Sequence, residues 1–295
     1  MVAASRRTMK IMTSQIIDTH PHVISDDDTS YPRAPIGGKQ SDWAHDRPVT
    51  FAAYIAAMDQ AGVDKAAIVQ ASTCYGYDNN YLADSIAQLP ERVTGVACVD
   101  VIAPNAVERI RHWADRGMAG LRLYTGGSKM AFNVDWLDNP RSFPAWDAAG
   151  ELGLSICVQT RPIGLPKVDF LARRFPTTRI LIDHLARADI SDGPPYTAAD
   201  ALFRLAELPN VFLKVTPRTF DLVETGAASP ATFFPKLVAE FGSDRIAFGS
   251  NYPSSDGSLL AIVNRARKLF SVLSKTDQHM ILAGTAQRLY PSLSD

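Results

Sequence analysis

The feature that most constrains the fold of this 295-residue chain is a regular alternation between short apolar runs and amphipathic segments. Runs such as Ile180-Leu181-Ile182 place apolar side chains at consecutive positions, which is typical of parallel strands buried on both faces. Eight such runs are predicted as strands, and a predicted helix separates seven of them from the next. The predicted strands cover residues 16–22, 66–70, 93–99, 119–123, 154–158, 179–183, 211–215 and 245–248.

Eight strand–helix units over about 290 residues are the signature of a (β/α)8 barrel. The alternative is a doubly wound sheet, which binds its ligand at one switch point. No GxGxxG motif follows the first predicted strand, and polar residues follow nearly every strand rather than one or two. We therefore predict an α/β fold, a (β/α)8 TIM barrel, as a single domain over residues 16–295 after a flexible extension over residues 1–15.

Composition excludes several classes of protein. The net charge of −1 offers no basic surface for nucleic acid or an anionic membrane. No apolar run reaches the roughly 18 residues that a membrane span needs. Residues 1–15 lack the apolar core of a secretory signal, and the three cysteines form no CxxC pair. We expect a cytoplasmic protein without nucleic-acid or membrane partners, and a homo-oligomer remains open.

The most distinctive motif is Asp18-Thr19-His20-Pro21-His22, at the end of the first predicted strand. Residues i and i+2 of a strand point to the same face, so the two imidazoles are expected to project together, and Asp18 with them. Pro21 lacks an N–H and suits the end of a strand, where pairing stops. Two imidazoles on one side can clamp a metal ion or polarise a substrate, whereas a pair of hydrogen-bonded loop histidines is the structural alternative.

The carboxyl ends of barrel strands converge on one mouth, where active sites lie. The residues that the sequence places there are His20, His22, Ser72, Tyr75, Tyr77, Arg122, Tyr124, Gln159, Arg161, His184, Arg187, Lys214, Arg218 and Asn251. Arg122 has a surface ion pair as its structural alternative, and Lys214, which alternates with Leu213, has an outward position as its structural alternative. Three histidines and several arginines without a carboxylate pair favour a small substrate with two acid groups or an acidic sugar. The lack of a GxSxG elbow disfavours a serine nucleophile.

Two further segments are predicted from local signals. Residues 25–48 are rich in proline and contain Gly37-Gly38, and a loop of this length is more typical of a functional lid than of a linker. Thr50 is expected to cap the helix that follows, which Gly62 ends. Residues 197–208 are predicted as one helix.

Four motifs together resemble the amidohydrolase superfamily. They are residues 18–22 (Asp-Thr-His-Pro-His), 121–124 (Leu-Arg-Leu-Tyr), 182–187 (Ile-Asp-His-Leu-Ala-Arg) and 248–253 (Phe-Gly-Ser-Asn-Tyr-Pro). Their order looks most like the lactonase branch, which includes 2-pyrone-4,6-dicarboxylate lactonase, 4-sulfomuconolactone hydrolase and galactarolactone isomerase. The likeness extends from about residue 16 to residue 290. The first motif is common to much of the superfamily, and the last two are more specific to this branch.

The resemblance implies roles for the mouth residues. The histidines His20, His22 and His184 would bind one divalent metal, zinc being the best candidate, or polarise a lactone carbonyl without a metal. The substrate carboxylates would be held by Arg122, Arg187 and Arg218. Further substrate contacts would come from Ser72, Tyr75, Tyr124 and Gln159.

Two positions depart from the pattern of the superfamily. Asn251 stands where an aspartate usually serves as metal ligand and general base, and an amide cannot take a proton. Gln159 stands where many metal-dependent members carry a histidine. Both changes weaken a binuclear site and leave at most one metal on three histidines, or none.

Hydrolysis of a small anionic lactone, similar to a muconolactone or a pyrone dicarboxylate from aromatic compound catabolism, is the leading hypothesis. A zinc-bound water has a pKa of about 7, which would lessen the need for a base at Asn251. The alternative is a lactone isomerase, in which a hydroxyl of the substrate attacks the carbonyl. A non-catalytic barrel and a decarboxylase of the same superfamily rank lower.

Overall fold

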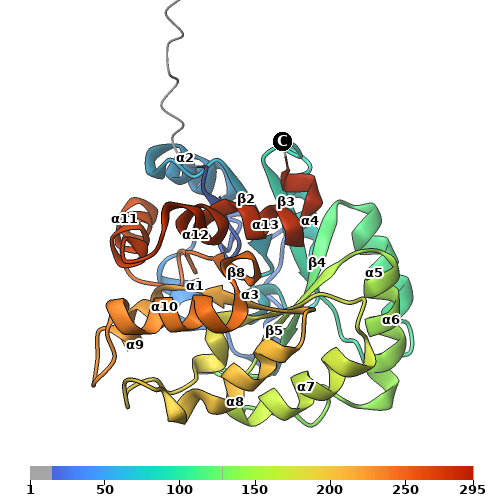
Figure 1. The fold of residues 1–295 in the computed structure, drawn as a ribbon. Coiled ribbons are helices and arrows are strands. Elements are labelled where there is room, and N and C mark those ends of the chain that lie inside the picture. The colour runs from blue at the N-terminus through green and yellow to red at the C-terminus, as the bar shows by residue number, and fades with distance from the viewer. Residues whose placement is uncertain (1–14, 128, 295) are drawn as a thin grey trace, which may run out of the picture.

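The computed structural model describes residues 15–127 and 129–294, and within them eight parallel strands form one sheet in sequence order (Figure 1). The strands are β1 (Ile17–Asp18), β2 (Lys65–Val69), β3 (Val93–Cys98), β4 (Met118–Tyr124), β5 (Ser155–Gln159), β6 (Ile180–Ile182), β7 (Val211–Val215) and β8 (Ile246–Phe248). This order, with helices between the strands, is the predicted (β/α)8 barrel. The predicted extension over residues 1–15 lies outside the described residues, apart from Gln15.

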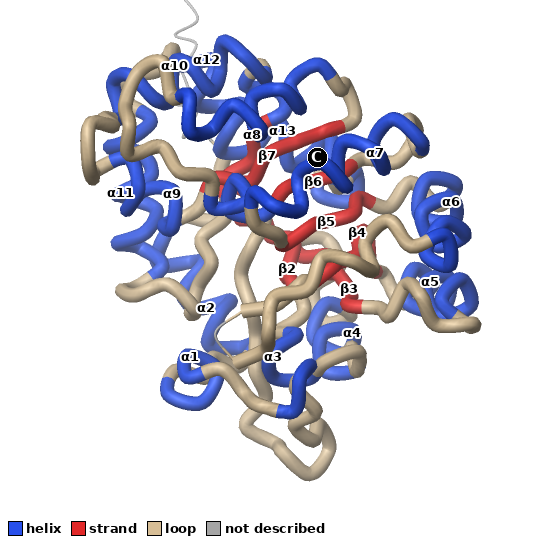
Figure 2. Tube along the Cα trace, turned by 90° about the horizontal axis from the view of Figure 1, so that it is seen from below, coloured by secondary structure: helices blue, strands red, loops and turns tan. Residues whose placement is uncertain are grey.

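Helices surround the strands on the outside, as the blue and red tubes of Figure 2 show. They are α1 (Asp42–Asp46), α2 (Phe51–Ala61), α3 (Ser72–Tyr75), α4 (Asn80–Ile86), α5 (Ala106–Asp115), α6 (Phe143–Glu151), α7 (Leu165–Arg174), α8 (Asp200–Phe203), α9 (Pro217–Val223), α10 (Pro230–Phe241), α11 (Leu259–Phe270), α12 (Lys275–His279) and α13 (Thr285–Leu289). Helix α2 begins and ends as predicted: the Thr50 hydroxyl accepts a hydrogen bond from the Ala53 amide, and Gly62 is left-handed with φ 68°.

Side chains alternate between the barrel interior and the helix layer along each strand. On β2, for example, Ala67 and Val69 belong to an interior cluster, whereas Ala66 and Ile68 pack in the larger core under the helices. The interior cluster also contains Tyr290 from the C-terminal segment, so this segment covers the end of the barrel opposite the mouth. The lower interior is therefore apolar and closed.

The seam between β1 and β8 is held by polar groups. The Thr19 amide donates to the Phe248 carbonyl at 3.1 Å. Asp18 accepts hydrogen bonds from the Ser250 amide at 2.8 Å, from the His20 amide at 3.0 Å and from the Tyr54 hydroxyl at 3.2 Å. This carboxylate, which was expected to point with the histidines, instead ties the two edges of the sheet together.

Two further sequence hypotheses are wrong. Lys214 does not point outward: it is completely buried, on the same side of β7 as Phe212 and therefore inside the barrel. The neighbours Leu213 and Val215 face the helix layer instead. Residues 197–208 are not one helix but a 3-10 turn, the four residues of α8 and a second 3-10 turn.

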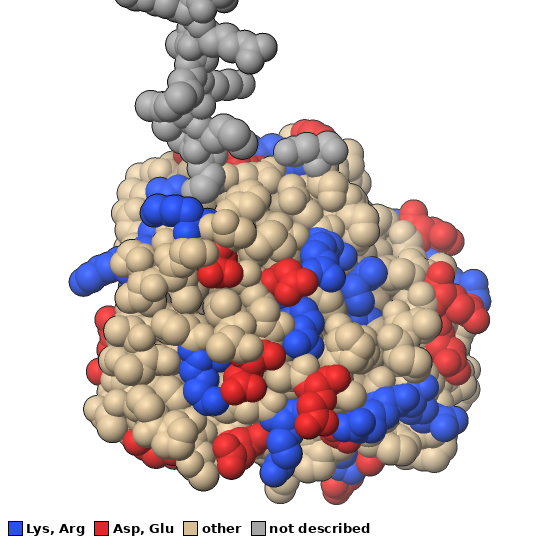
Figure 3. Space-filling model, in the orientation of Figure 1, with Lys and Arg blue, Asp and Glu red and all other residues tan. Residues whose placement is uncertain are grey.

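Charged side chains of both signs are mixed over the face shown in Figure 3, and neither sign gathers there into a large patch. Among the described residues, no helix combines the length and the apolar character that a membrane crossing requires.

The seam yields a stability prediction. Replacing Asp18 with alanine leaves the buried amides of Ser250 and His20 without an acceptor, and we expect a loss of about 2–4 kcal/mol in the free energy of unfolding. The milder Tyr54→Phe change removes one donor only and should cost about 1 kcal/mol. Urea unfolding of both variants measures these values, and equal losses in the two would contradict the role assigned to Asp18.

Candidate active site

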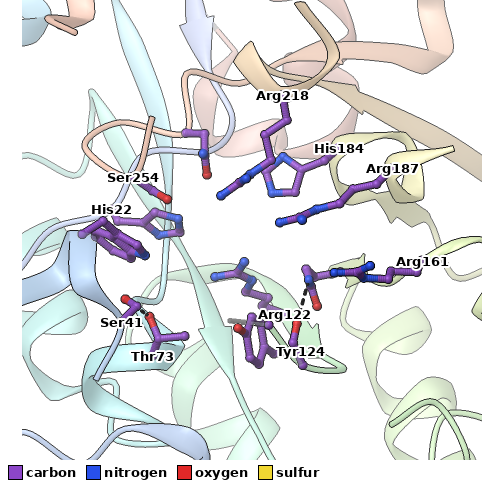
Figure 4. A pocket seen from close by; sticks show the side chains of 15 residues that line it. His22, Ser41, Thr73, Arg122, Tyr124, Arg161, His184, Arg187, Arg218 and Ser254 are labelled. Atoms are coloured by element: carbon purple, nitrogen blue, oxygen red, sulfur yellow. Dashed lines mark hydrogen bonds between the residues drawn. The ribbon is translucent and has the colours of Figure 1, made fainter. Parts of the chain in front are cut away.

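A pocket of about 280 Å³ opens at the carboxyl ends of the strands (Figure 4). Its lining residues are His22, Ser41, Trp43, Thr73, Arg122, Tyr124, Gly126, Gly127, Gln159, Arg161, His184, Arg187, Arg218, Asn251 and Ser254. The structure therefore brings most of the candidate residues together although they come from different strands. Five of the candidates are absent from the lining: His20, Ser72, Tyr75, Tyr77 and Lys214.

Four arginines give the pocket its charge. Figure 4 shows Arg122, Arg161, Arg187 and Arg218 reaching into the same space, with His22 on the opposite side. No Asp or Glu is found among the described residues that line the pocket. Burial and the nearby cations Arg218 and Arg161 lower the pKa of Arg187, so these side chains are held together against their mutual repulsion. An anion in the pocket would relieve that repulsion.

His22 presents one ring nitrogen to ligands. Its Nδ1 lies 2.7 Å from the Val69 carbonyl oxygen, which only accepts, so Nδ1 carries the proton and Nε2 has a free electron pair. Burial is the main cause that lowers the pKa of His22 from 6.5 to about 3, and the charge of Arg122 is the second cause. The ring stacks on Trp43 of α1, with 5.2 Å between the ring centroids. The predicted lid over residues 25–48 thus supplies one wall of the pocket.

His184 and Arg187 are placed by an unusual backbone. Residues 184–187 all have φ values of 52–54°, the left-handed region that side chains other than glycine rarely adopt. In a 3-10 turn, residues three apart lie above one another, and His184 and Arg187 both reach the pocket. Each left-handed residue costs roughly 1 kcal/mol or more, and such strain is concentrated at functional sites. Asn251, also at the pocket, has a φ of 51°.

A buried network lies beneath the pocket. Lys214 Nζ is 2.9 Å from Asp183 Oδ1 and 2.9 Å from His20 Nδ1, and these three side chains are buried. The Arg122 guanidinium approaches the second Asp183 oxygen at 3.7 Å. Burial alone would raise the pKa of Asp183, but the charge of Lys214 outweighs it and holds this pKa well below its usual range. Asp183 is therefore a carboxylate that balances buried cations.

The histidine cluster does not fit the predicted metal. The His20 ring lies 5.0 Å from the His22 ring and 4.7 Å from the His184 ring, between centroids. Over residues 15–127 and 129–294, however, no group of three or more His, Cys, Asp or Glu side chains is arranged to hold a metal ion. The cations Lys214 and Arg122 also lie against this cluster, where they would repel a dication.

The remaining candidates have mainly structural contacts. Gln159 lines the pocket, but its side chain accepts from the Thr125 amide at 3.2 Å and donates to the Gly126 carbonyl at 3.0 Å, which fixes the loop after β4. Tyr75 accepts from the Ser25 amide and from Arg33, so it anchors the lid. Ser72 is buried below the mouth and donates to a backbone carbonyl at 3.3 Å.

Several important residues escaped the sequence reasoning. Trp43, Ser41 and Thr73 reach the pocket from the lid and from α3, and loop sequences give no signal for such contacts. Asp183 and Lys214 had a usable signal. Each is a charged residue within or next to a short apolar strand, and Lys214 shares its face of β7 with Phe212.

Comparisons with known proteins agree with this geometry. The profile of the amidohydrolase family matches residues 17–292. The chain is 29% identical over 198 residues to the L-fucono-1,5-lactonase of Burkholderia ambifaria, across 66% of this chain and 67% of that protein.

Solved structures share the fold. A probable 2-pyrone-4,6-dicarboxylic acid hydrolase from Acinetobacter baumannii, with citric acid bound, has a TM-score of 0.75 and 20% identity, over 94% of this chain and 99% of its own. A Pseudomonas putida protein given the same hydrolase name has a TM-score of 0.76 and 22% identity, over 96% and 99%. The same fold occurs in a zinc-bound amidohydrolase from Burkholderia multivorans (TM-score 0.69, 20% identity) and in 2,6-dihydroxybenzoate decarboxylase (TM-score 0.66, 15% identity). At these identities the structures establish the fold alone.

The buried histidines predict an acid-sensitive protein. In the folded protein the pKa of His22 is about 3, whereas in the unfolded chain it is 6.5. Between these two pH values the unfolded chain binds a proton at His22 and the folded chain does not. Stability is therefore present above pH 6.5 and is lost as the pH falls toward 3. We expect His22→Gln to reduce the fall in unfolding free energy between pH 6.5 and 4.5 by up to about 1.4 kcal/mol per pH unit.

Urea unfolding at several pH values measures this slope. The matched control is His45→Gln on α1, because the His45 side chain is 80% exposed. That change should leave the slope as it is in the unaltered protein. Equal slopes for the His22 variant and the unaltered protein would contradict the assignment of His22 as a neutral buried base.

Proposed function

The chain belongs to the amidohydrolase family, as its motifs predicted, and on that premise we propose that it hydrolyses a small lactone carrying two anionic groups. The observation that carries the proposal is the composition of the pocket: four arginines, no acidic side chain among the described lining residues, and two imidazoles, of which that of His22 has a free electron pair. The Burkholderia ambifaria lactonase in the same family supports lactone chemistry.

The arginines define the substrate class. A guanidinium binds a carboxylate through two parallel hydrogen bonds, and the four arginines on one side of the pocket have charge to neutralise two such groups. The Acinetobacter baumannii structure, which holds the tricarboxylate citric acid, supports a polyanionic ligand for this fold. A pocket of about 280 Å³ suits one small ring with its carboxylates.

The reaction that follows uses His22 as the base. Its Nε2 takes a proton from a water molecule, the oxygen of that water attacks the lactone carbonyl carbon, and the negative charge that develops on the carbonyl oxygen faces the arginines. The C–O bond of the ring then breaks, and the ring oxygen receives the proton from the His22 imidazolium. Water and lactone give one hydroxy acid.

Substrate binding would tune this base. A pKa of about 3 makes His22 a weak base in the empty pocket, and Arg122 contributes to that low value. A carboxylate bound to Arg122 offsets its charge and so raises the pKa of His22 toward the working pH. The base would therefore be activated by the anionic substrate that the arginines select.

The lack of a carboxylate base in the lining also favours a second candidate. Asn251 occupies the position where the family carries an aspartate, and its Nδ2 donates to Ser255 Oγ at 2.8 Å. Stacking of Trp43 on His22 further limits the room for water beside the base. In a lactone isomerase a hydroxyl of the substrate replaces the water, and one lactone becomes another.

Turnover in ¹⁸O-labelled water separates the candidates. A panel of dicarboxylated lactones is incubated with the protein, and the products are analysed by mass spectrometry. Hydrolysis puts one label into the new carboxylate, whereas isomerisation gives an unlabelled lactone. Release of carbon dioxide would instead place the protein with the decarboxylases, and absence of any conversion across the panel would reject the proposed function.

The arginines give a prediction on affinity. Replacing Arg187 with glutamine keeps a polar side chain but removes one cation, and we expect KM for a dicarboxylated lactone to rise about 10- to 100-fold, the effect of losing about 1.5–3 kcal/mol of charged hydrogen bonding. The matched control is Arg173→Gln on α7, where the arginine pairs with Asp169 away from the pocket. A lactone without carboxylates should show no difference between the two variants. An unchanged KM for the Arg187 variant would contradict the substrate class.

A further inference from the structure

We propose that Lys214 is a positioning residue that fixes the proton of His20 on Nε2, and so keeps this histidine a hydrogen-bond donor instead of a metal ligand. The inference concerns the buried network below the pocket and does not depend on which lactone reaction occurs. It is carried by the contacts of Lys214 Nζ.

The ammonium group of Lys214 has three protons and no electron pair to share. Three acceptors surround it: Asp183 Oδ1 at 2.9 Å, His20 Nδ1 at 2.9 Å and Cys157 Sγ at 3.5 Å. Nζ donates hydrogen bonds to His20 Nδ1 and Cys157 Sγ, and Asp183 Oδ1 is its ion-pair partner. The side chain is completely buried, and its ion-pair partner, the Asp183 carboxylate, lies 2.9 Å away.

The proton position on His20 follows from this arrangement. An ammonium can only donate to His20 Nδ1, so that nitrogen must hold an electron pair, and the proton of the neutral ring is on Nε2. The opposite arrangement, a proton on Nδ1 shared with Asp183, has the longer separation of 3.4 Å and would bring two donors face to face at 2.9 Å.

His20 Nε2 has no hydrogen-bond partner within the described part of the chain, and it is buried. An unsatisfied buried donor costs about 1–3 kcal/mol, which favours an oxygen acceptor supplied from outside the protein. His22 has the opposite tautomer, because its Nδ1 donates to the Val69 carbonyl. The two neighbouring histidines therefore offer one donor and one acceptor.

The His20 tautomer also explains the misfit with a metal. A zinc ligand needs an electron pair on the coordinating nitrogen, and a metal-bound histidine usually donates its other ring N–H to a carboxylate or a carbonyl. His22 satisfies this rule through Val69. His20 does not, because Lys214 occupies the side of the ring where Asp183 would accept. Without Lys214, His20 Nδ1 would carry the ring proton and donate it to Asp183, and His20 Nε2 would have a free electron pair.

Nitrogen NMR of the unaltered protein tests the tautomer directly. Long-range ¹H–¹⁵N spectra of ¹⁵N-histidine-labelled protein distinguish a protonated ring nitrogen from a bare one, and His20→Gln assigns the His20 signals. We expect His20 to show a bare Nδ1 and a protonated Nε2, and His22 to show the reverse. A protonated Nδ1 on His20 would overturn the proposal, whatever the protein does to lactones.

Zinc titration calorimetry of Lys214→Met provides the second test. We expect the variant to bind zinc about 10- to 100-fold more tightly than the unaltered protein, and its His20 proton to move to Nδ1. Cys157→Ala is the matched control: it removes the weakest contact of Lys214, leaves those with His20 and Asp183, and should change neither property. Zinc affinity that is unchanged in a folded Lys214→Met variant would also overturn the proposal. If that variant does not fold, the spectra of the unaltered protein still decide.

Discussion

The ion pair between Lys214 and Asp183, which is wholly removed from water, is the interaction on which the centre of this barrel depends. Two charges inside a barrel are expensive to desolvate, and each is tolerated because the other is 2.9 Å away. The pair divides the interior into two parts. Below it the side chains are apolar and the C-terminal segment closes the barrel, and above it the histidines and arginines gather. Through His20 Nδ1, the same pair also reaches the histidines of the mouth.

Two features of the mouth are energetically unfavourable. Residues 184–187 have a left-handed backbone, and Arg187, Arg161 and Arg218 are held close together without an acidic side chain in the lining. Both features cost stability when the pocket is empty. Both are also what a polyanionic ligand needs, because rigid cations that repel one another bind an anion without first having to be brought together. The strain and the proposed substrate therefore explain each other.

The lid lies beside His22, the proposed base, where the attacking oxygen would approach the lactone. Trp43 stacks on His22, and Ser41 bonds to Thr73 at 2.7 Å, so the loop from residue 25 to residue 48 is fastened to the barrel beside the base. An aromatic wall excludes water from one side of the imidazole. The proposed hydrolysis and the alternative isomerisation differ only in the oxygen that attacks the carbonyl, and the space beside His22 would decide between them.

The sequence by itself determined the barrel and most of the mouth. Buried parallel strands require consecutive apolar residues, and the barrel places whatever follows each strand at one end, so Arg122, His184 and Asn251 could be brought together from their positions in the chain. It also determined the family, because the motifs around His184 and Asn251 are specific.

Tertiary structure decided the rest. The sequence left open whether Lys214 points outward or toward the mouth, and only its distances to Asp183 and His20 show it as a buried cation. Trp43 came from a loop whose path no local pattern fixes. The fit of a metal and the positions of protons depend on separations of a few tenths of an ångström between residues on different strands. Periodicity predicts the face on which a side chain lies, but these separations arise only when the barrel packs.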